Sequence, residues 1–419
     1  MKKLIINTLL KAGKIIVIFA LAVALVVAIA KISNLNNADL ETGDIAAQDE
    51  NGAPIPNNLY ISAPGGMGIS EGDTFTGAAC GSGNSFYIRA DGTLWATGIN
   101  EDGRLGTGNY DDTGEPVKVT ENVEAVKTGE KHTLILKKDK TLWSMGSNDA
   151  GQLGNGNTSG SNKPVRILDD VISFDAGNSY NAAVKADGTL WAWGENKNKR
   201  IDETSAYITK PVKIMEDCKA VAAGRDVILV IKRDGSLWDS AKDSGNVEDD
   251  GNIENGENIE NVGNDGMAEQ DAAIAWNVTD VCAGGNHFAY ISEGKLFTFG
   301  DNQFGQLGSG NNNESKDPIQ IDTDVEKITA GSNHTLYIKK DGSLWATGKN
   351  DVGQLGDRTV ENKNTPVKIA EGIKNVYARF DTSVMIKTAD GAAWIFGDNK
   401  SRQFADLFNV VTTPVKVLP

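Results

Sequence analysis

The sequence predicts an all-β protein, a seven-bladed β-propeller of about four strands per blade, preceded by one N-terminal hydrophobic helix. Three features predict it: a repeated tryptophan phrase, an Asp-Gly pair inside the repeats, and a Pro-led strand between them. A fixed period indicates one supersecondary unit copied in series, each copy burying its apolar face against its neighbours. The aromatic anchors are spaced by 48, 48, 47, 59, 48 and 49 residues and are Trp95, Trp143, Trp191, Trp238, Phe297, Trp345 and Trp394.

Each unit contains signals for two hairpins. An Asp-Gly pair stands between two alternating apolar runs, and it favours a tight turn because Gly supplies the positive φ. The pairs are at 91–92, 187–188, 234–235 and 341–342. A second hairpin is predicted between a Pro-led run such as P-V-K-I and the strand that precedes the next repeat Gly, joined by a short polar turn such as Asp169-Asp170. In such runs Pro fits the first position of an edge strand. These runs are at 116–119, 164–167, 211–214, 318–321 and 366–369, each 13 residues before the repeat Gly of the next unit, which Arg379 replaces in the last.

Ring closure is predicted to use both ends of the repeat region. The first unit begins at 75–79 with no Pro-led run before it, and the run at 414–418 has no strand after it. We therefore expect residues 414–418 to supply the strand that the first blade lacks. Both ends would then join one blade, and closure would remove the exposed sheet edges.

The repeat resembles that of the regulator of chromosome condensation family. The resemblance rests on A-G-x-x-H-T-L at 330–336, D-G-x-L-W-x-x-G at 341–348, N-x-x-G-Q-L-G at 350–356 and P-V-K-I at 366–369, and it covers 75–418. It implies a seven-bladed propeller that serves as a scaffold for protein–protein contacts. In that family these include nucleotide exchange on a small GTPase and, in secreted bacterial members, inhibition of β-lactamases. Neither activity follows from the fold alone.

The N-terminal segment, 1–31, is predicted to be a membrane anchor or a signal segment. Residues 15–30 are sixteen consecutive apolar residues, with four lysines before them and Lys31 after them. Extended to 12–30, they fit a single membrane span whose lysine excess places the propeller outside. An A-x-A motif also fits a signal peptide cleaved after Ala30, which would give a secreted protein. Both interpretations export the propeller, as in the exported bacterial members of the family that the repeat resembles.

Two segments carry only acidic charge. Residues 32–74 contain seven acids, residues 243–271 contain ten, and neither segment contains Lys or Arg. We expect the first to be a disordered linker before the propeller at 75–419, and an insert at 240–271 to be a low-complexity loop in the fourth repeat. Since the whole chain has a net charge of −16, the remainder is close to neutral, and we expect no nucleic-acid partner.

The insert also contains a weak calcium-loop pattern. Calcium coordination needs several oxygen-bearing side chains at alternate positions of a loop with a Gly at its turn, and Gly251 would be that Gly. However, Asn holds the first position and the sequence around it is of low complexity, which favours a solvated loop. The candidate ligands are Asn246, Glu248, Asp250, Asn252 and Glu257.

The remaining candidate sites favour structural roles. His132, His287 and His334 each follow the repeat Gly by three residues, where another unit carries Val227, so we expect no metal there. The phrase N-x-x-G-Q-L-G is predicted to be a turn whose Asn tolerates a left-handed conformation and whose Gln bonds local backbone. The three cysteines, Cys80, Cys218 and Cys282, are predicted to be small buried side chains.

The sequence shows no nucleophile–base pair and no P-loop, so we expect no enzyme, no catalytic residue and no cofactor. Our first hypothesis is an extracellular, membrane-anchored propeller that binds an unidentified protein partner, such as an envelope enzyme. Loops that break the repeat are the expected contacts. The candidate anchors are Arg200, Tyr207, Trp276, Arg402, Phe404 and Phe408.

Two other functions stay open. The first is recognition of cell-wall polymer or glycan, with Tyr110, Phe304 and Phe404 as aromatic platforms. The second is an enzyme of the cell envelope, for which the sequence names no cluster of acids.

Overall fold

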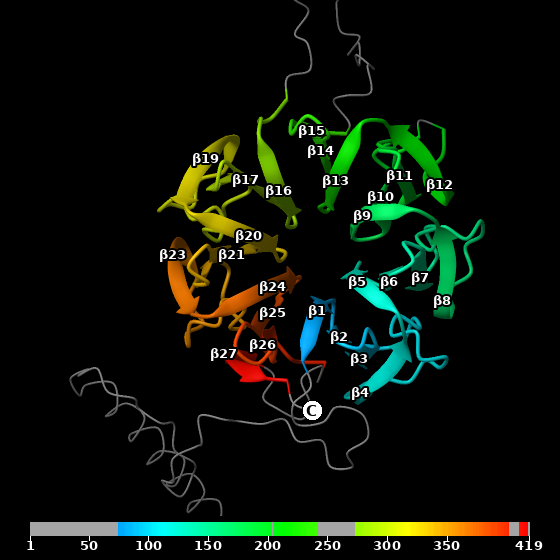
Figure 1. Ribbon diagram of the computed structural model, residues 1–419, viewed down its shortest axis with the longest axis horizontal. Coiled ribbons are helices and arrows are strands. Elements are labelled where there is room, and N and C mark those ends of the chain that lie inside the picture. The colour runs from blue at the N-terminus through cyan, green and yellow to red at the C-terminus, as the bar shows by residue number, and fades with distance from the viewer. Residues whose placement is uncertain (1–73, 203, 241–272, 402–409, 418–419) are drawn as a thin grey trace, which may run out of the picture. The chain divides into compact units, whose positions relative to one another are not determined.

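The computed structural model describes residues 74–202, 204–240, 273–401 and 410–417. They form one ring of seven antiparallel sheets, or blades, that follow one another around a central opening in sequence order (Figure 1). The predicted seven-bladed propeller of about four strands per blade is thereby confirmed. The N-terminal segment, the linker at 32–73 and the insert at 241–272 lie outside the described residues. No helix within the described part is long and apolar enough to cross a membrane.

Within the described residues, six blades contain four strands and blade four contains three. Blade one is β1 (Phe75–Cys80), β2 (Asn84–Arg89), β3 (Leu94–Gly98) and β4 (Thr113–Thr120). Blade two is β5 (Val123–Thr128), β6 (His132–Lys137), β7 (Leu142–Gly146) and β8 (Ser161–Leu168). Blade three is β9 (Val171–Ala176), β10 (Tyr180–Lys185), β11 (Leu190–Glu195) and β12 (Tyr207–Met215). Blade four is β13 (Cys218–Ala223), β14 (Ile228–Lys232) and β15 (Leu237–Asp239).

The last three blades complete the ring. Blade five is β16 (Val278–Ala283), β17 (His287–Ser292), β18 (Lys295–Gly300) and β19 (Ser315–Thr323). Blade six is β20 (Val325–Ala330), β21 (His334–Lys339), β22 (Leu344–Gly348) and β23 (Lys363–Ala370). Blade seven is β24 (Ile373–Arg379), β25 (Thr382–Lys387), β26 (Ala393–Asp398) and β27 (Val410–Lys416).

The prediction that the two ends share one blade is wrong. Strand β27 pairs with β26 through Trp394–Lys416 and Ile395–Val415, and blade one is complete without it. Each Pro-led run is the outermost strand of its own blade. The first blade therefore needs no strand from the end of the chain. The ring closes instead by contact between complete blades. The Phe75 N–H donates to the Gly391 carbonyl at 2.8 Å, and one hydrophobic cluster contains both Phe75 and Phe396.

The antiparallel order divides the propeller into two faces. One face, which we call the loop face, carries the connections between the first and second strands and the long connections between the third and fourth. The opposite face, which we call the turn face, carries the Asp-Gly turns and the links between blades. Since β1 begins and β27 ends on the turn face, the chain enters and leaves the propeller there.

The repeated tryptophan is a framework residue of the turn face. In blade two the Trp143 indole N–H donates to Thr141 at 2.8 Å, and the Thr141 hydroxyl donates to Asp139 at 2.7 Å. The Lys137 ammonium lies 4.7 Å from the Trp143 ring centre, a cation–π distance. Blades one, three, four and six repeat this arrangement. The tryptophan phrase therefore describes the scaffold rather than a binding site.

Candidate binding site on the loop face

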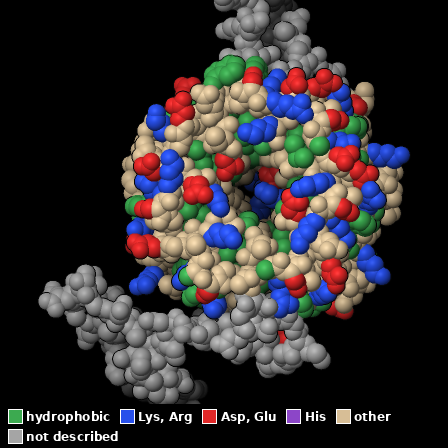
Figure 2. Space-filling view, in the orientation of Figure 1, with side chains coloured by type: hydrophobic (Ala, Val, Ile, Leu, Met, Phe, Trp, Pro, Cys, Tyr) green, Lys and Arg blue, Asp and Glu red, His purple; other side chains and the backbone are tan. Residues whose placement is uncertain are grey.

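A central channel runs along the first strands of the seven blades, with a cavity of about 140 Å³. Figure 2 shows its opening at the centre of the ring. The Lys127 ammonium lies 3.3 Å from an Asp175 carboxylate oxygen in the channel wall. Burial raises the pKa of Asp280, which also lines the channel, to about 6. Burial likewise raises the pKa of the Cys80 thiol to about 12, so this thiol stays protonated and unreactive at neutral pH.

Arg379 crosses the loop-face end of this channel. Its guanidinium donates to the Ala176 carbonyl at 2.6 Å and to the Ala223 carbonyl at 3.3 Å. One side chain of blade seven thereby links blades three and four on the other side of the ring. The sequence showed the replacement of the repeat Gly by Arg379, but the distance that it spans depends on the closed ring.

The three histidines link neighbouring blades. Each Nε2 lies at hydrogen-bond distance from a polar side chain of the next blade: His132 at 2.6 Å from Asn181, His287 at 3.0 Å from Thr335, and His334 at 2.9 Å from Ser383. Among the described residues, no cluster of His, Cys, Asp or Glu could hold a metal ion. The structural interpretation of these histidines is consistent with their contacts.

The N-x-x-G-Q-L-G phrase forms a self-bonded loop, as predicted for its glutamines. The Gln152 side-chain oxygen accepts from the Ala150 N–H at 2.8 Å, and Gln306 and Gln354 repeat this bond in blades five and six. The role expected for Asn was wrong, since Asn148 is not among the residues with positive φ. Its side-chain oxygen accepts from the Leu153 N–H at 2.8 Å, while its amide donates to the far side of the loop. Asn therefore closes the loop by hydrogen bonding.

Blade three breaks this loop pattern. Lys199 occupies the position of the loop Gly and has a φ of 53°, a left-handed conformation that is unfavourable for a side chain with a Cβ. Arg200 replaces Gln, and Ile201 replaces the inward-facing Leu. Asn196 closes this loop as Asn148 closes the loop of blade two, because its side-chain oxygen accepts from the Ile201 N–H at 2.8 Å. The loop thus keeps its fold while its outer residues differ.

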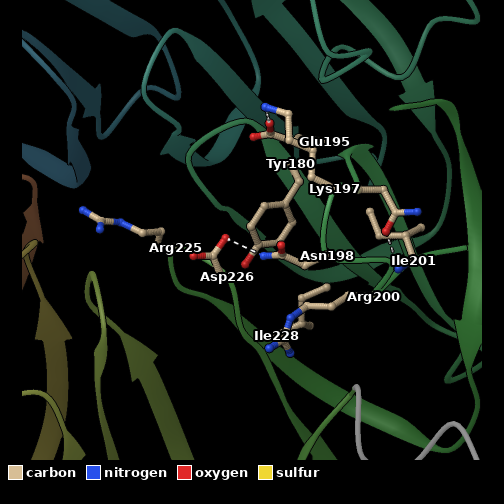
Figure 3. A pocket seen from close by; sticks show the side chains of 10 residues that line it. Tyr180, Glu195, Lys197, Asn198, Arg200, Ile201, Arg225, Asp226 and Ile228 are labelled. Carbon is tan, nitrogen blue, oxygen red and sulfur yellow. Dashed lines mark hydrogen bonds and ion pairs between the residues drawn. The ribbon is translucent and has the colours of Figure 1, made fainter. Parts of the chain in front are cut away.

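A cavity of about 130 Å³ lies where this loop meets blade four, and we call it the seam pocket (Figure 3). The Asn198 amide donates to Asp226 at 3.0 Å across it, and Lys197 pairs with Glu195 at its edge. Figure 3 shows that the Arg225 side chain points away from the other pocket side chains. The pocket is lined by Tyr180, Glu195, Asn196, Lys197, Asn198, Arg200, Ile201, Arg225, Asp226 and Ile228.

Of the three sequence-predicted anchors that the structure describes, two lie together. Arg200 lines the seam pocket, and Tyr207, which is 44% exposed, pairs with the pocket residue Glu195 across β11 and β12. Trp276 is 59% exposed but lies in the link that leads into β16, on the turn face. Arg402, Phe404 and Phe408 lie outside the described residues, as do the calcium candidates at 246–257.

The two described aromatic residues of the glycan hypothesis lie on separate blades. Tyr110 belongs to the long loop of blade one and is 55% exposed, whereas Phe304 belongs to that of blade five. The Lys349 ammonium lies 5.8 Å from the Phe304 ring centre. Blades one and five are not neighbours in the ring, so these two rings do not form one platform.

Sequence reasoning missed Arg225, Asp226 and Asp239 as residues of this region. Asp239 accepts from Arg200 at 3.2 Å. The signal was present in the sequence, because Arg225-Asp226 stands where blades one, three, five and six carry small or amide side chains. It could not be interpreted without knowing that the blade-four connection faces the long loop of blade three.

Comparison with known proteins identifies the repeat. The model of the "Regulator of chromosome condensation (RCC1) repeat" matches residues 91–136, 139–184, 293–338 and 341–380. A second model of the same repeat matches 123–152 and 325–354. The chain thus contains regulator of chromosome condensation repeats within a seven-bladed propeller.

Curated relatives share short stretches with this repeat propeller. The X-linked retinitis pigmentosa GTPase regulator homolog of Caenorhabditis elegans is 36% identical over 83 residues, which are 19% of this chain and 6% of that protein. The ultraviolet-B receptor UVR8 of Arabidopsis thaliana is 36% identical over 66 residues, 15% of each chain. The matched stretches therefore span only a small part of either relative.

Solved structures share the whole fold. Yeast RCC1 (Prp20), crystallised with Kap60, has a TM-score of 0.63 at 19% identity, over 79% of this chain and 84% of its own. Human WBSCR16 has a TM-score of 0.61 at 22% identity, over 76% and 87% of the two chains. At these identities the likeness shows the architecture, not a shared partner.

Proposed function

We propose that this repeat propeller is a protein-binding module that contacts its partner through the loop face at the seam between blades three and four. One observation carries the proposal: the repeat is broken where the seam pocket opens. Blades two, five and six fill the equivalent loop with a Gln bonded to its own backbone. Blade three instead presents Arg200 beside a cavity that the described part of the chain leaves open.

The residues at the seam have the chemistry of interface anchors. Tyr and Arg are enriched among the residues that contribute most to protein–protein affinity, and Tyr207 and Arg200 lie on adjoining parts of this loop. Arg225 is exposed and extends from the same seam. The scaffold around them is rigid because every neighbouring strand is paired within its blade, and binding groups are well positioned by such supports.

The relatives support binding rather than catalysis. One yeast structure is described by its binding properties to Gsp1p and histones, and another is a complex with Kap60. These partners belong to those proteins. For this chain they support only the broader statement that such a propeller serves as a binding module, and we propose no enzymatic activity.

We further propose that residues 12–30 hold the propeller on the outer side of a membrane and that the partner is an envelope protein such as an envelope enzyme. The sixteen-residue apolar run and its preceding lysines support this placement. Protease treatment of intact cells tests it. Digestion of the propeller without lysis is the expected result, and protection until lysis would contradict an external location.

Crosslinking on intact cells followed by mass identification would name the partner, and binding of the purified partner would then test the site. We expect Arg200→Ala and Tyr207→Ala each to weaken binding about tenfold, equivalent to about 1.4 kcal/mol. Tyr110→Ala is the matched control, because Tyr110 is an exposed aromatic residue of the loop face on blade one. Equal affinity of all three variants and the wild type would exclude this seam as the contact.

A further inference from the structure

The seam between blades one and two shows how this propeller fills such a site. Arg104 occupies the long loop of blade one, at the position equivalent to Arg200, and is buried. Its guanidinium donates to the Ser82 carbonyl at 3.3 Å and to the Glu130 carbonyl at 3.1 Å, and it pairs with Asp102. A guanidinium with two acidic partners, Asp102 and Glu101, and two carbonyls from adjacent blades thus closes this seam.

Blade three carries Arg200 at the same position but directs it elsewhere. The Arg200 guanidinium lies 3.2 Å from Asp239, near the end of β15. In blade two the residue equivalent to Asp239 is Ser144, whose hydroxyl donates to the Leu153 carbonyl at 2.7 Å. Asp239 therefore attracts Arg200 into blade four, and the space that Arg104 fills in the first seam becomes the seam pocket.

The seam pocket offers acceptors for a guanidinium, although Asn198 stands where the first seam has the acidic Asp102. Arg225 lines the pocket and is equivalent to Glu130, and Asn178 is equivalent to Ser82 by its place in the repeat. The Asn178 carbonyl accepts one hydrogen bond, from the Glu130 N–H at 3.0 Å, and a carbonyl oxygen has two lone pairs. The Arg225 carbonyl accepts no hydrogen bond from the described part of the chain. Asp226 supplies a carboxylate whose neighbour, Asn198, is neutral.

The basic side chains of the pocket do not compete for this carboxylate. Lys197 pairs with Glu195, Arg200 with Asp239, and Arg225 points away from the pocket. Ile201 and Ile228 supply an apolar wall against which the methylene groups of an arginine can pack. The interior thus offers acceptors and an apolar wall, which suit an arginine better than an acidic side chain.

We propose that the seam pocket binds an arginine side chain of the partner, which takes the place that Arg104 holds in the first seam. This inference rests on the proposed binding function and specifies the chemistry of the contact. The incoming guanidinium pairs with Asp226, displaces the Asn198 amide, and donates to the carbonyls of Arg225 and Asn178. A planar guanidinium can make these bonds at once, which a lysine ammonium cannot do with the same geometry.

Titration of the full chain with Nα-acetyl-arginine amide, followed by backbone amide NMR, tests the proposal without the natural partner. We expect saturable shifts at the amides of Asn198, Arg225 and Asp226. The neutral isostere Nα-acetyl-citrulline amide should shift these amides at least fivefold less. In Asp226→Asn the affinity for the arginine probe should fall at least fivefold. Asp149→Asn is the matched control, since Asp149 is an exposed acid on the loop of blade two.

A second variant is designed to let the protein's own Arg200 side chain occupy the seam pocket. Asp239→Ser restores the residue found in blade two and releases Arg200 toward the seam. We expect this variant to lose the response to the arginine probe while its thermal unfolding stays cooperative.

Three results would overturn the proposal: equal responses to the arginine and citrulline probes, a stronger response to Nα-acetyl-glutamate amide, or no response to any probe. None of them would affect the binding function itself, because that function is tested separately by the affinity of the purified partner for Arg200→Ala and Tyr207→Ala.

Discussion

Single side chains of this propeller link one blade to the next. His132, His287 and His334 are fully buried at the loop-face ends of their strands, and each reaches a polar group of the following blade through Nε2. Burial lowers the pKa of His132 and His287 to about 4 and that of His334 to about 3. All three rings are therefore neutral at pH 7.

These low pKa values predict a loss of stability in acid. The unfolded chain binds protons on histidine below its ordinary pKa of about 6.5, whereas the folded chain does not. Stability is therefore complete above pH 6.5 and falls by about 3 kcal/mol per imidazole as the pH approaches 4. Asp280 acts in the opposite direction, since its raised pKa of about 6 favours the folded state at low pH.

Urea unfolding of the wild type and of His334→Gln between pH 4 and 8 would measure this effect. We expect the difference in unfolding free energy between the two proteins to change by roughly 2–3 kcal/mol across this range, in favour of the variant at low pH. A difference that stays constant with pH would contradict the buried neutral imidazole.

Blade seven contains an unsatisfied tryptophan. The Trp394 indole N–H has no hydrogen-bond partner among the described residues, because Ala392 stands where the equivalent blades carry Thr or Ser. In blade six the equivalent Ser343 hydroxyl accepts from Trp345 at 2.9 Å. A buried donor without an acceptor costs about 1 kcal/mol or more.

Ala392→Ser should therefore stabilise the propeller by about 0.5–1 kcal/mol, measured by urea unfolding at pH 7. Ser343→Ala provides the reverse control and should destabilise it by a similar amount. If the serine has no effect while Ser343→Ala does, the Trp394 indole has another partner.

At the scale of the strands, each blade is one continuous segment that runs from the inner to the outer edge of its sheet. The Asp-Gly hairpins and the edge position of the Pro-led strands were predicted correctly because they depend on local turn and strand chemistry. The predicted hairpin between a Pro-led strand and the first strand of the next unit is wrong, because these strands, such as β8 and β9, belong to different blades. The shared closing blade was predicted wrongly because a Pro-led run can belong to the unit before it or the unit after it. Only strand pairing distinguishes these two arrangements, and β27 pairs with β26.

Deletion of residues 414–419 should now affect blade seven rather than ring closure. The deletion removes the pairing of Lys416 with Trp394 and the buried side chain of Val417. Hydrogen exchange should accelerate at amides of β26. Amides of β1 and β24 should keep their protection, because the Phe75–Gly391 hydrogen bond and the other members of the cluster between blades one and seven stay in place. If β1 lost as much protection as β26, the result would support a ring closed by one blade that both ends of the repeat region share.

In the candidate site, too, residues with a local sequence signal could be predicted, whereas residues whose role depends on neighbouring blades could not. Arg200 and Tyr207 could be predicted because the blade-three loop departs visibly from a repeated phrase. Asp226 and Asp239 could not, because their relevance depends on which loop of the neighbouring blade they face. Neither the diversion of Arg200 nor the pocket that it leaves has a signal in local sequence.

Across the whole molecule, Arg379 connects parts of the ring that are far apart in sequence. It links blade seven to the carbonyls of Ala176 and Ala223, at the seam that carries the proposed binding pocket. Hydrogen bonds from a charged group typically contribute about 1.5–3 kcal/mol. The side chain also covers one end of the channel, in whose wall Cys80 and Cys282 lie.

Arg379→Gly, which restores the repeat residue, should destabilise the ring by about 2 kcal/mol and open the channel. We expect Cys80 and Cys282 to react faster with a small maleimide, measured by mass spectrometry of the labelled peptides. Cys218 is the internal control, because it is buried in the cluster between blades three and four and does not line the channel. Uniform acceleration at all three cysteines would indicate global unfolding instead.

The repeat period, the turn residues and the apolar alternation determined the fold class from sequence alone, because each acts over a few residues and is written seven times. The tertiary structure alone decided how the ring closes, which side chains cross it and where a seam stays open. Those outcomes depend on contacts between segments 203 residues apart, as for Arg379 and Ala176, or 302 residues apart, as for Cys80 and Thr382. No pattern within one repeat encodes which distant carbonyl or carboxylate a charged side chain will find.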